Sequence, residues 1–113
     1  AFYFYKLKNL TDFVESVNKL YKANRLNADQ LHLYSWMMYE SGKVVSDGLR
    51  WINESIRMDK DIEKLQTKAA MQYLYSDYQS ARETALEAKK MAKKDYKNMT
   101  NIENLIRMIE QKR

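Results

Sequence analysis

The chain repeats itself, and the length of the repeat is the feature that most limits its fold. When the sequence is shifted by 34 residues, apolar and small residues fall on residues of the same kind. The matched pairs include Leu31 with Leu65, Met37 with Met71, Tyr39 with Tyr73, Gly42 with Ser76 and, at a shift of 33, Gly48 with Ala81 and Ser55 with Ala88. A period of this length with two helical segments in each unit is typical of helix-turn-helix repeats. The sequence therefore predicts an all-α fold of stacked, antiparallel helix pairs.

The composition agrees with an all-helical domain. The 113 residues contain no proline and two glycines, 45% are hydrophobic and 31% are charged, which argues against disorder. The absence of cysteine excludes disulfides, thiolate chemistry and cysteine metal ligands. No apolar run is long enough to predict a membrane span. Because the chain begins at Ala1 rather than at a methionine, we expect it to be part of a longer protein.

Capping signals divide this single domain into about six helices. We expect an N-terminal segment and helix in residues 1–26, a first repeat in 27–60, a second in 61–94 and a capping helix in 95–113. Asn27 with Gln30 forms a capping-box pattern, and Thr100 with Glu103 forms another, which predicts that the last helix opens at Thr100 after a connector. Asp59 or Asp61 is expected to cap the helix that starts at about Ile62.

Small residues recur where helices must approach closely. They are Ser35, Gly48, Ser55, Ala69, Ala81 and Ala88. Together with the apolar positions of the repeat, they give residues 27–94 a pattern that resembles the tetratricopeptide repeat (TPR) family. Lys68 and Gln72 depart from that pattern, as does the lack of proline after each repeat. The resemblance implies a right-handed α-solenoid that ends in a capping helix.

The TPR resemblance also implies a place for binding, since the first helix of each TPR repeat lines a concave face. The outward residues of these two helices are the partner-binding candidates: His32, Trp36, Tyr39, Glu40, Gln66 and Tyr73. Aromatic side chains with a polar atom are good anchors for a peptide segment or for an upstream domain of the same protein. The alternative is that the three aromatic residues pack between helices.

A second resemblance involves the run from Tyr34 through Trp36 and Tyr39 and the turn from Tyr73 to Ala81. These stretches are similar to helical tails that follow thioredoxin-like domains in bacterial thiol-disulfide proteins. This resemblance implies a regulatory or spacer tail in the periplasm. Otherwise a cytoplasmic location is expected.

The sequence contains no pattern of catalytic residues. His32 is the only histidine, and no phosphate-binding loop, nucleophile elbow or metal-ligand cluster accompanies it. We therefore predict a non-catalytic protein without a cofactor, whose oligomeric state the sequence does not fix.

The third possible function is binding through a basic helix face. This face consists of Lys89, Lys90, Lys93, Lys94 and Lys97. Such a face would contact an anionic surface or nucleic acid, but it is also what a solvated outer face looks like. Nucleic acid is not favoured, because arginine and interleaved aromatic residues are missing from this stretch.

Overall fold

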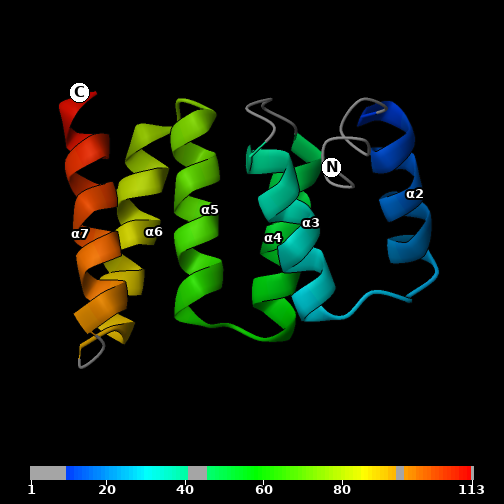
Figure 1. Ribbon diagram of the computed structural model, residues 1–113, viewed down its shortest axis with the longest axis horizontal. Helices are drawn as coiled ribbons and strands as arrows, with labels where there is room; N and C mark the ends of the chain where they lie inside the picture. Colours follow the sequence, from blue (N-terminus) through cyan, green and yellow to red (C-terminus); the bar gives the residue numbers. More distant parts are fainter. Residues whose placement is uncertain (1–9, 41–45, 94–95, 113) are drawn as a thin grey trace.

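The computed structural model describes residues 10–40, 46–93 and 96–112, and within these ranges the chain forms six α-helices and no strand (Figure 1). The helices are α2 (Leu10–Lys22), α3 (Ala28–Glu40), α4 (Ser46–Met58), α5 (Ile62–Leu74), α6 (Tyr78–Met91) and α7 (Tyr96–Gln111). They follow one another in chain order from α2 to α7, with α4 behind α3 in the view of Figure 1, and successive helices run in opposite directions. The predicted all-α class is confirmed. The N-terminal segment 1–9 and Gly42 lie outside the described residues.

The packing partners of the helices follow the order of the chain. Helix α3 packs on α4, α4 on α5, α5 on α6, and α6 on α7. In addition, α5 packs on both α3 and α7, so the alternate helices form a layer of their own. Within the described residues, none of the helices has both the length and the apolar character needed to cross a bilayer.

The helix ends use the capping groups expected from the sequence. The Asn27 side chain accepts from the Gln30 backbone N–H at 2.8 Å, and the Gln30 side chain accepts from the Asn27 N–H at 3.0 Å. Asp61 accepts from the Lys64 N–H at 2.8 Å in the same way. At the other end of α5, Ser76 has a φ of 64° and completes a Schellman motif. Ser76 is the residue that the repeat aligns with Gly42.

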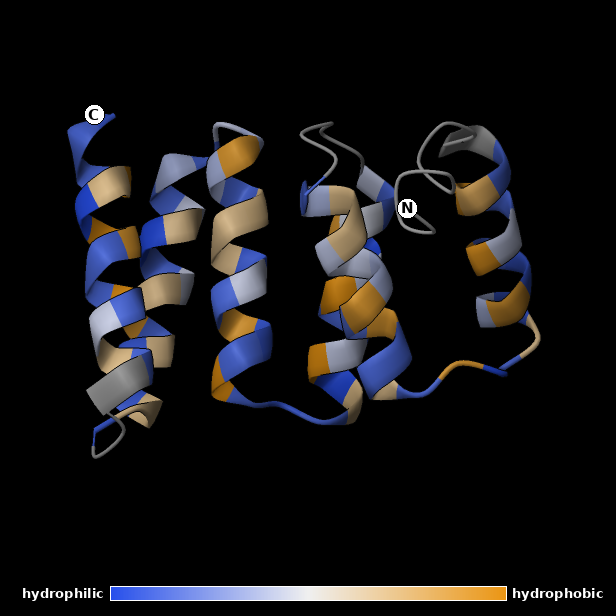
Figure 2. Cartoon of the chain, viewed as in Figure 1, coloured by the Kyte–Doolittle hydropathy of each residue, from blue (hydrophilic) through white to orange (hydrophobic). Residues whose placement is uncertain are grey.

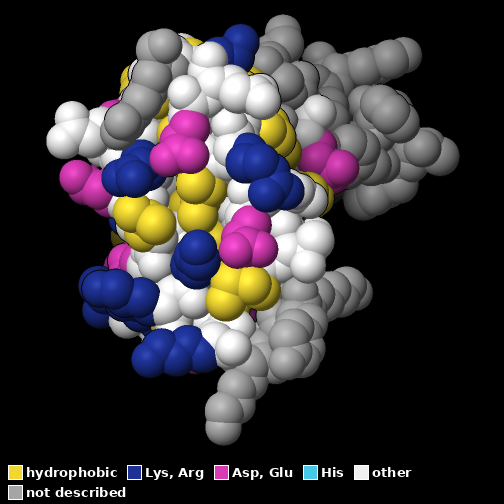
Figure 3. All heavy atoms as spheres, turned by 90° about the vertical axis from the view of Figure 1, so that its left-hand side faces the viewer, with side chains coloured by type: hydrophobic (Ala, Val, Ile, Leu, Met, Phe, Trp, Pro, Cys, Tyr) yellow, Lys and Arg dark blue, Asp and Glu magenta, His cyan; other side chains and the backbone are white. Residues whose placement is uncertain are grey.

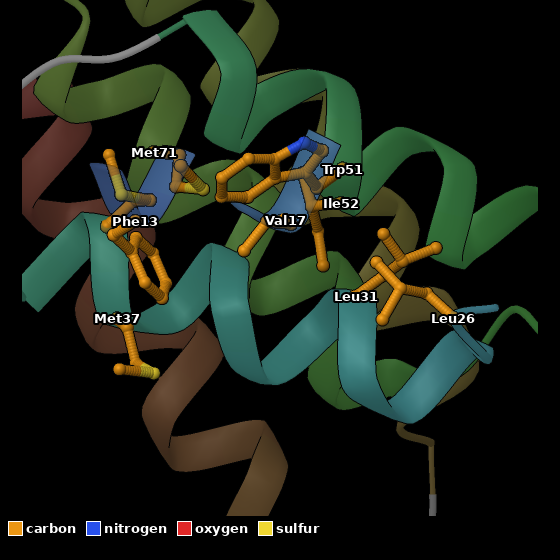
Figure 4. Close-up of a cluster of buried hydrophobic side chains, with 9 residues drawn as sticks. Phe13, Val17, Leu26, Leu31, Met37, Trp51, Ile52 and Met71 are labelled. Carbon is orange, nitrogen blue, oxygen red and sulfur yellow. The ribbon is translucent and has the colours of Figure 1, made fainter. Parts of the chain in front are cut away.

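Among the described residues, the core is divided into one large cluster and two smaller ones. The large cluster joins α2, α3 and α4 to one residue of α5, and contains Phe13, Val17, Leu26, Leu31, Met37, Met38, Trp51, Ile52 and Met71 (Figure 4). The apolar side of α2 faces α3 and α4 (Figure 2). The smaller clusters join α5, α6 and α7 around the alanines of α6. Two large side chains from α7, Ile102 and Ile109, are fully buried there.

The small residues permit the close helix contacts that the sequence predicts. Ser35, Gly48, Ser55, Ala69, Ala81 and Ala88 are all buried. At Gly48 a Cβ atom would lie 3.2 Å from the Cβ of Met38 and 2.5 Å from the Cε of Met71. Glycine therefore permits the close approach of α3 to α4 at this position, where a larger residue would crowd the Met38 Cβ and displace the flexible end of Met71.

The predicted start of the last helix is wrong. Helix α7 begins at Tyr96, so Thr100 lies inside the helix rather than at its cap. The four residues before Thr100 include no glycine or proline, and nothing in them prevents a helix. Thr100 and Glu103 match the sequence pattern of a capping box, but they do not cap the helix.

Candidate functional site

A hollow of about 500 Å³ opens on the layer formed by α3, α5 and α7. Helix α3 contributes Asp29, His32, Leu33 and Trp36, helix α5 contributes Glu63, Gln66, Thr67 and Ala70, and helix α7 contributes Asn98, Asn101 and Leu105. We call this hollow the groove. Each helix begins at the same end of the groove because the helix between each pair returns the chain to that end (Figure 1).

The structure separates the six candidate residues into two groups. His32, Trp36 and Gln66 line the groove. Tyr39, Glu40 and Tyr73 do not belong to its lining.

The three aromatic candidates differ in burial. Trp36 is 38% exposed, and its neighbour Leu33 is 55% exposed. Tyr39 lies against the Trp36 ring at a centroid distance of 5.0 Å and packs on the large core cluster. Tyr73 contacts Tyr78 at 5.6 Å and packs on the alanine-lined core. The groove thus contains one of these three aromatic rings, and the other two support the core.

Polar side chains join the three helices across the floor of the groove. The Nε2 atom of His32 lies 2.8 Å from the Thr67 hydroxyl, which links α3 to α5. The Gln66 amide donates to the Asn98 side-chain oxygen at 2.9 Å, which links α5 to α7. Partial burial lowers the pKa of His32, and the positive charge of Lys64 adds to this effect, while Asp61, Glu63 and Asp29 oppose it. His32 is therefore held in its neutral form near pH 7.

Lys64 is a buried charge that sequence reasoning missed. Its side chain is 1% exposed, and its ammonium donates to Asp61 at 2.8 Å, with carboxylates of Asp59 and Asp29 each at 3.6 Å. Burial alone would lower the pKa of Lys64, but the Asp61 hydrogen bond and the three carboxylate charges raise it above its ordinary value. The lysine remains charged and ties the start of α3 to the turn before α5.

A signal for this arrangement does exist in the repeat. A shift of 34 residues places Asp61 on Asn27 and Lys64 on Gln30. The capping box of the first repeat is therefore replaced by a charged pair at the equivalent turn of the second.

The groove is acidic at the end where its helices begin. Asp29 and Glu63 line that end, and Asp59 and Asp61 lie beside it around Lys64. In the described ranges, no set of histidine, aspartate and glutamate side chains is arranged to hold a metal ion. Between the three aspartates lies the Lys64 ammonium.

The predicted basic face is only partly described. Lys89 lies 3.6 Å from Glu103, and Lys90 and Lys93 are exposed. Lys94 and the side chain of Lys97 lie outside the described part of the chain. On the side of the molecule toward α7, positive side chains alternate with carboxylates and apolar groups (Figure 3).

Comparisons of the chain with protein-family models, with curated proteins and with solved structures found no match.

Proposed function

We propose that this chain is a non-catalytic, TPR-like interaction module that binds a protein segment in the groove. In this proposal α3 with α4 and α5 with α6 are the two repeats of a right-handed solenoid, and α7 caps the second. From α3 to α7 each helix packs on the next, and this packing, together with the contacts of α5 with α3 and α7, supports such a stack. The segment comes from another protein or from an upstream domain of the same protein.

One observation carries the binding proposal: the groove exposes two large apolar side chains of α3, Leu33 and Trp36, opposite the half-buried Leu105 of α7. Leu33 and Trp36 stand three residues apart on α3, so they present one continuous patch. The other tryptophan, Trp51, is completely buried, and its indole N–H donates to Asn18 at 2.9 Å. An exposed apolar patch in a concave surface with amide groups beside it is characteristic of a binding site.

The amide side chains suit a peptide backbone in particular. The exposed Asn101 places an amide along the groove beside Gln66 and Asn98, which are hydrogen-bonded to each other, and amides pair with backbone N–H and C=O groups irrespective of peptide sequence. A hollow of this size and open form accepts an extended segment of a few residues. The basic face lacks comparable support, because Lys89 lies near Glu103.

The test is a selection of short peptides from a random library against the whole chain, followed by measurement of their affinity. Leu33→Ala should weaken binding by about tenfold, which corresponds to the loss of one buried apolar anchor. Leu20→Ala is the matched control, since Leu20 is also exposed but lies on α2, away from the groove. A library that yields no binding peptide, or equal losses in the two variants, would refute groove binding.

A further inference from the structure

We propose that the segment held in the groove is cationic: it carries a lysine or arginine about three residues from an apolar or aromatic side chain. This inference rests on the proposed function and specifies the partner of the same groove. The lysine or arginine lies at the end formed by Asp29 and Glu63, and the apolar side chain lies on Leu33 and Trp36.

The first step of the argument is the charge at that end. Four carboxylates gather there: those of Asp29, Asp59 and Asp61 surround the Lys64 ammonium, and that of Glu63 lines the groove beside them. The single ammonium offsets one of the four, which leaves three negative charges. The groove histidine does not reduce this excess, because His32 is neutral near pH 7.

Acidic residues are common in the first turn of a helix, where they compensate the positive partial charge of the helix N-terminus. The charge count at this end of the groove must therefore include the helix N-termini. Each helix N-terminus contributes about half a positive charge, and three of them meet at this end of the groove. The three half-charges are together smaller than the three negative charges that remain. The end of the groove therefore still attracts a cation.

The second step is the contrast with the rest of the protein. The chain as a whole carries a net charge of +5. Long-range attraction to such a protein favours acidic peptides, and the groove favours basic ones. A basic partner therefore gains from the local charge of the groove and not from the net charge of the whole protein.

The third step is the distance between the acidic end and the apolar patch. Asp29 and Trp36 are seven residues apart on α3, as are Glu63 and Ala70 on α5, which corresponds to about 10 Å along a helix axis. An extended peptide advances about 3.3 Å per residue. Two side chains that reach both places are therefore about three residues apart.

The library selection described above also tests the identity of the partner. The expected result is enrichment of lysine or arginine about three positions from phenylalanine, tryptophan, leucine or methionine. Enrichment of acidic peptides, or of apolar peptides without a cation, would overturn this inference and leave the proposed function standing. Failure to enrich any peptide would overturn both.

The selected peptide is then measured against a charge variant and a matched control. The variant Asp29→Asn/Glu63→Gln removes two carboxylates from the groove, and Asp12→Asn/Glu83→Gln removes two exposed carboxylates elsewhere. The groove variant should lose about tenfold in affinity and most of the salt dependence of binding, while the control changes less than about twofold. Replacing the peptide's lysine with norleucine should abolish the difference between wild type and the groove variant. Equal losses in the two variants would overturn the charge argument.

Discussion

Replacement of Lys64 by methionine tests the reasoning about the buried charge. Methionine keeps most of the buried apolar volume but removes the ammonium that lies among three carboxylates. The expected effect is a loss of stability at neutral pH. The competing effect is the cost of burying a lysine, which the substitution removes.

The magnitude follows from the contacts. A hydrogen bond between charged groups, such as that from Lys64 to Asp61, contributes about 1.5–3 kcal/mol. The two contacts at 3.6 Å involve carboxylates that are 71% and 91% exposed, so together they add about 1 kcal/mol or less. The carboxylates left behind are solvated, which avoids the larger penalty of a buried unpaired charge. After the gain from not burying an ammonium, the net loss should be about 2 kcal/mol, or about 8 °C in Tm.

The pH dependence identifies the charge as the cause. Partial burial raises the pKa of Asp61, but the hydrogen bonds from Lys64 outweigh this and hold it below the ordinary value of 3.8. Stability from a lowered carboxyl pKa is present above the ordinary pKa and is lost as pH falls through the folded-state value. Stability from the raised pKa of Lys64 is present below its ordinary value of 10.5 and is lost only at higher pH. The difference in the free energy of unfolding between wild type and Lys64→Met should thus be largest between about pH 4 and 10 and should decrease at more acidic pH.

Urea unfolding of both proteins at neutral and acidic pH measures this difference. Lys68→Met on the same helix is the control and should change stability by less than about 0.5 kcal/mol. The additional variant Asp61→Asn keeps a capping group but removes its charge, so the double-mutant cycle isolates the pair. A Lys64→Met protein as stable as wild type at neutral pH would show that desolvation outweighs the attraction, which refutes the reasoning.

Three further predictions concern single residues. Gly48→Ala should destabilise by about 1 kcal/mol in urea unfolding, because crowding against Met38 and Met71 exceeds the gain in helix propensity, and increased stability would contradict the close approach. Ser76→Gly should stabilise by about 0.5–1 kcal/mol, because glycine adopts the φ of 64° without strain, and a loss of stability in thermal unfolding would contradict this. Burial lowers the pKa of His32, so the neutral histidine stabilises the fold above the ordinary pKa of 6.5, and this stability is lost as the pH falls. The variant His32→Gln should therefore flatten the decline in the free energy of unfolding between about pH 7 and 5. Unfolding curves with identical pH dependence would exclude that role.

Much of the fold could be predicted because its signals are local. The capping box at Asn27 and Gln30 depends on residues three apart, and the small residues of the repeat report close contacts directly. Helical periodicity places His32, Trp36 and Gln66 on outward positions, and these residues line the hollow; their role in binding stays a prediction. That α3 and α5 lie in one layer follows from the repeat period.

The remaining features depend on side-chain direction and on distant contacts. Tyr39 and Tyr73 occupy the boundary between the outer and inner faces of their helices, where periodicity does not determine burial. Asn98 was missed because the expected start of α7 at Thr100 left it in a connector. Lys64 was missed because a lysine is normally exposed, and its burial depends on carboxylates contributed by two separate segments.

The order of the helices has a consequence for synthesis of the protein. Contacts between helices one or two places apart need little loop closure, so each new helix can add to those already made as the chain leaves the ribosome. The large core cluster consists of residues up to Ile52 and, in addition, Met71 from α5, so it can form before α6 and α7 are synthesised. The groove, in contrast, needs Leu105 from α7 as its third wall. We therefore expect the nascent chain to fold through α7 before the groove can hold the proposed partner segment.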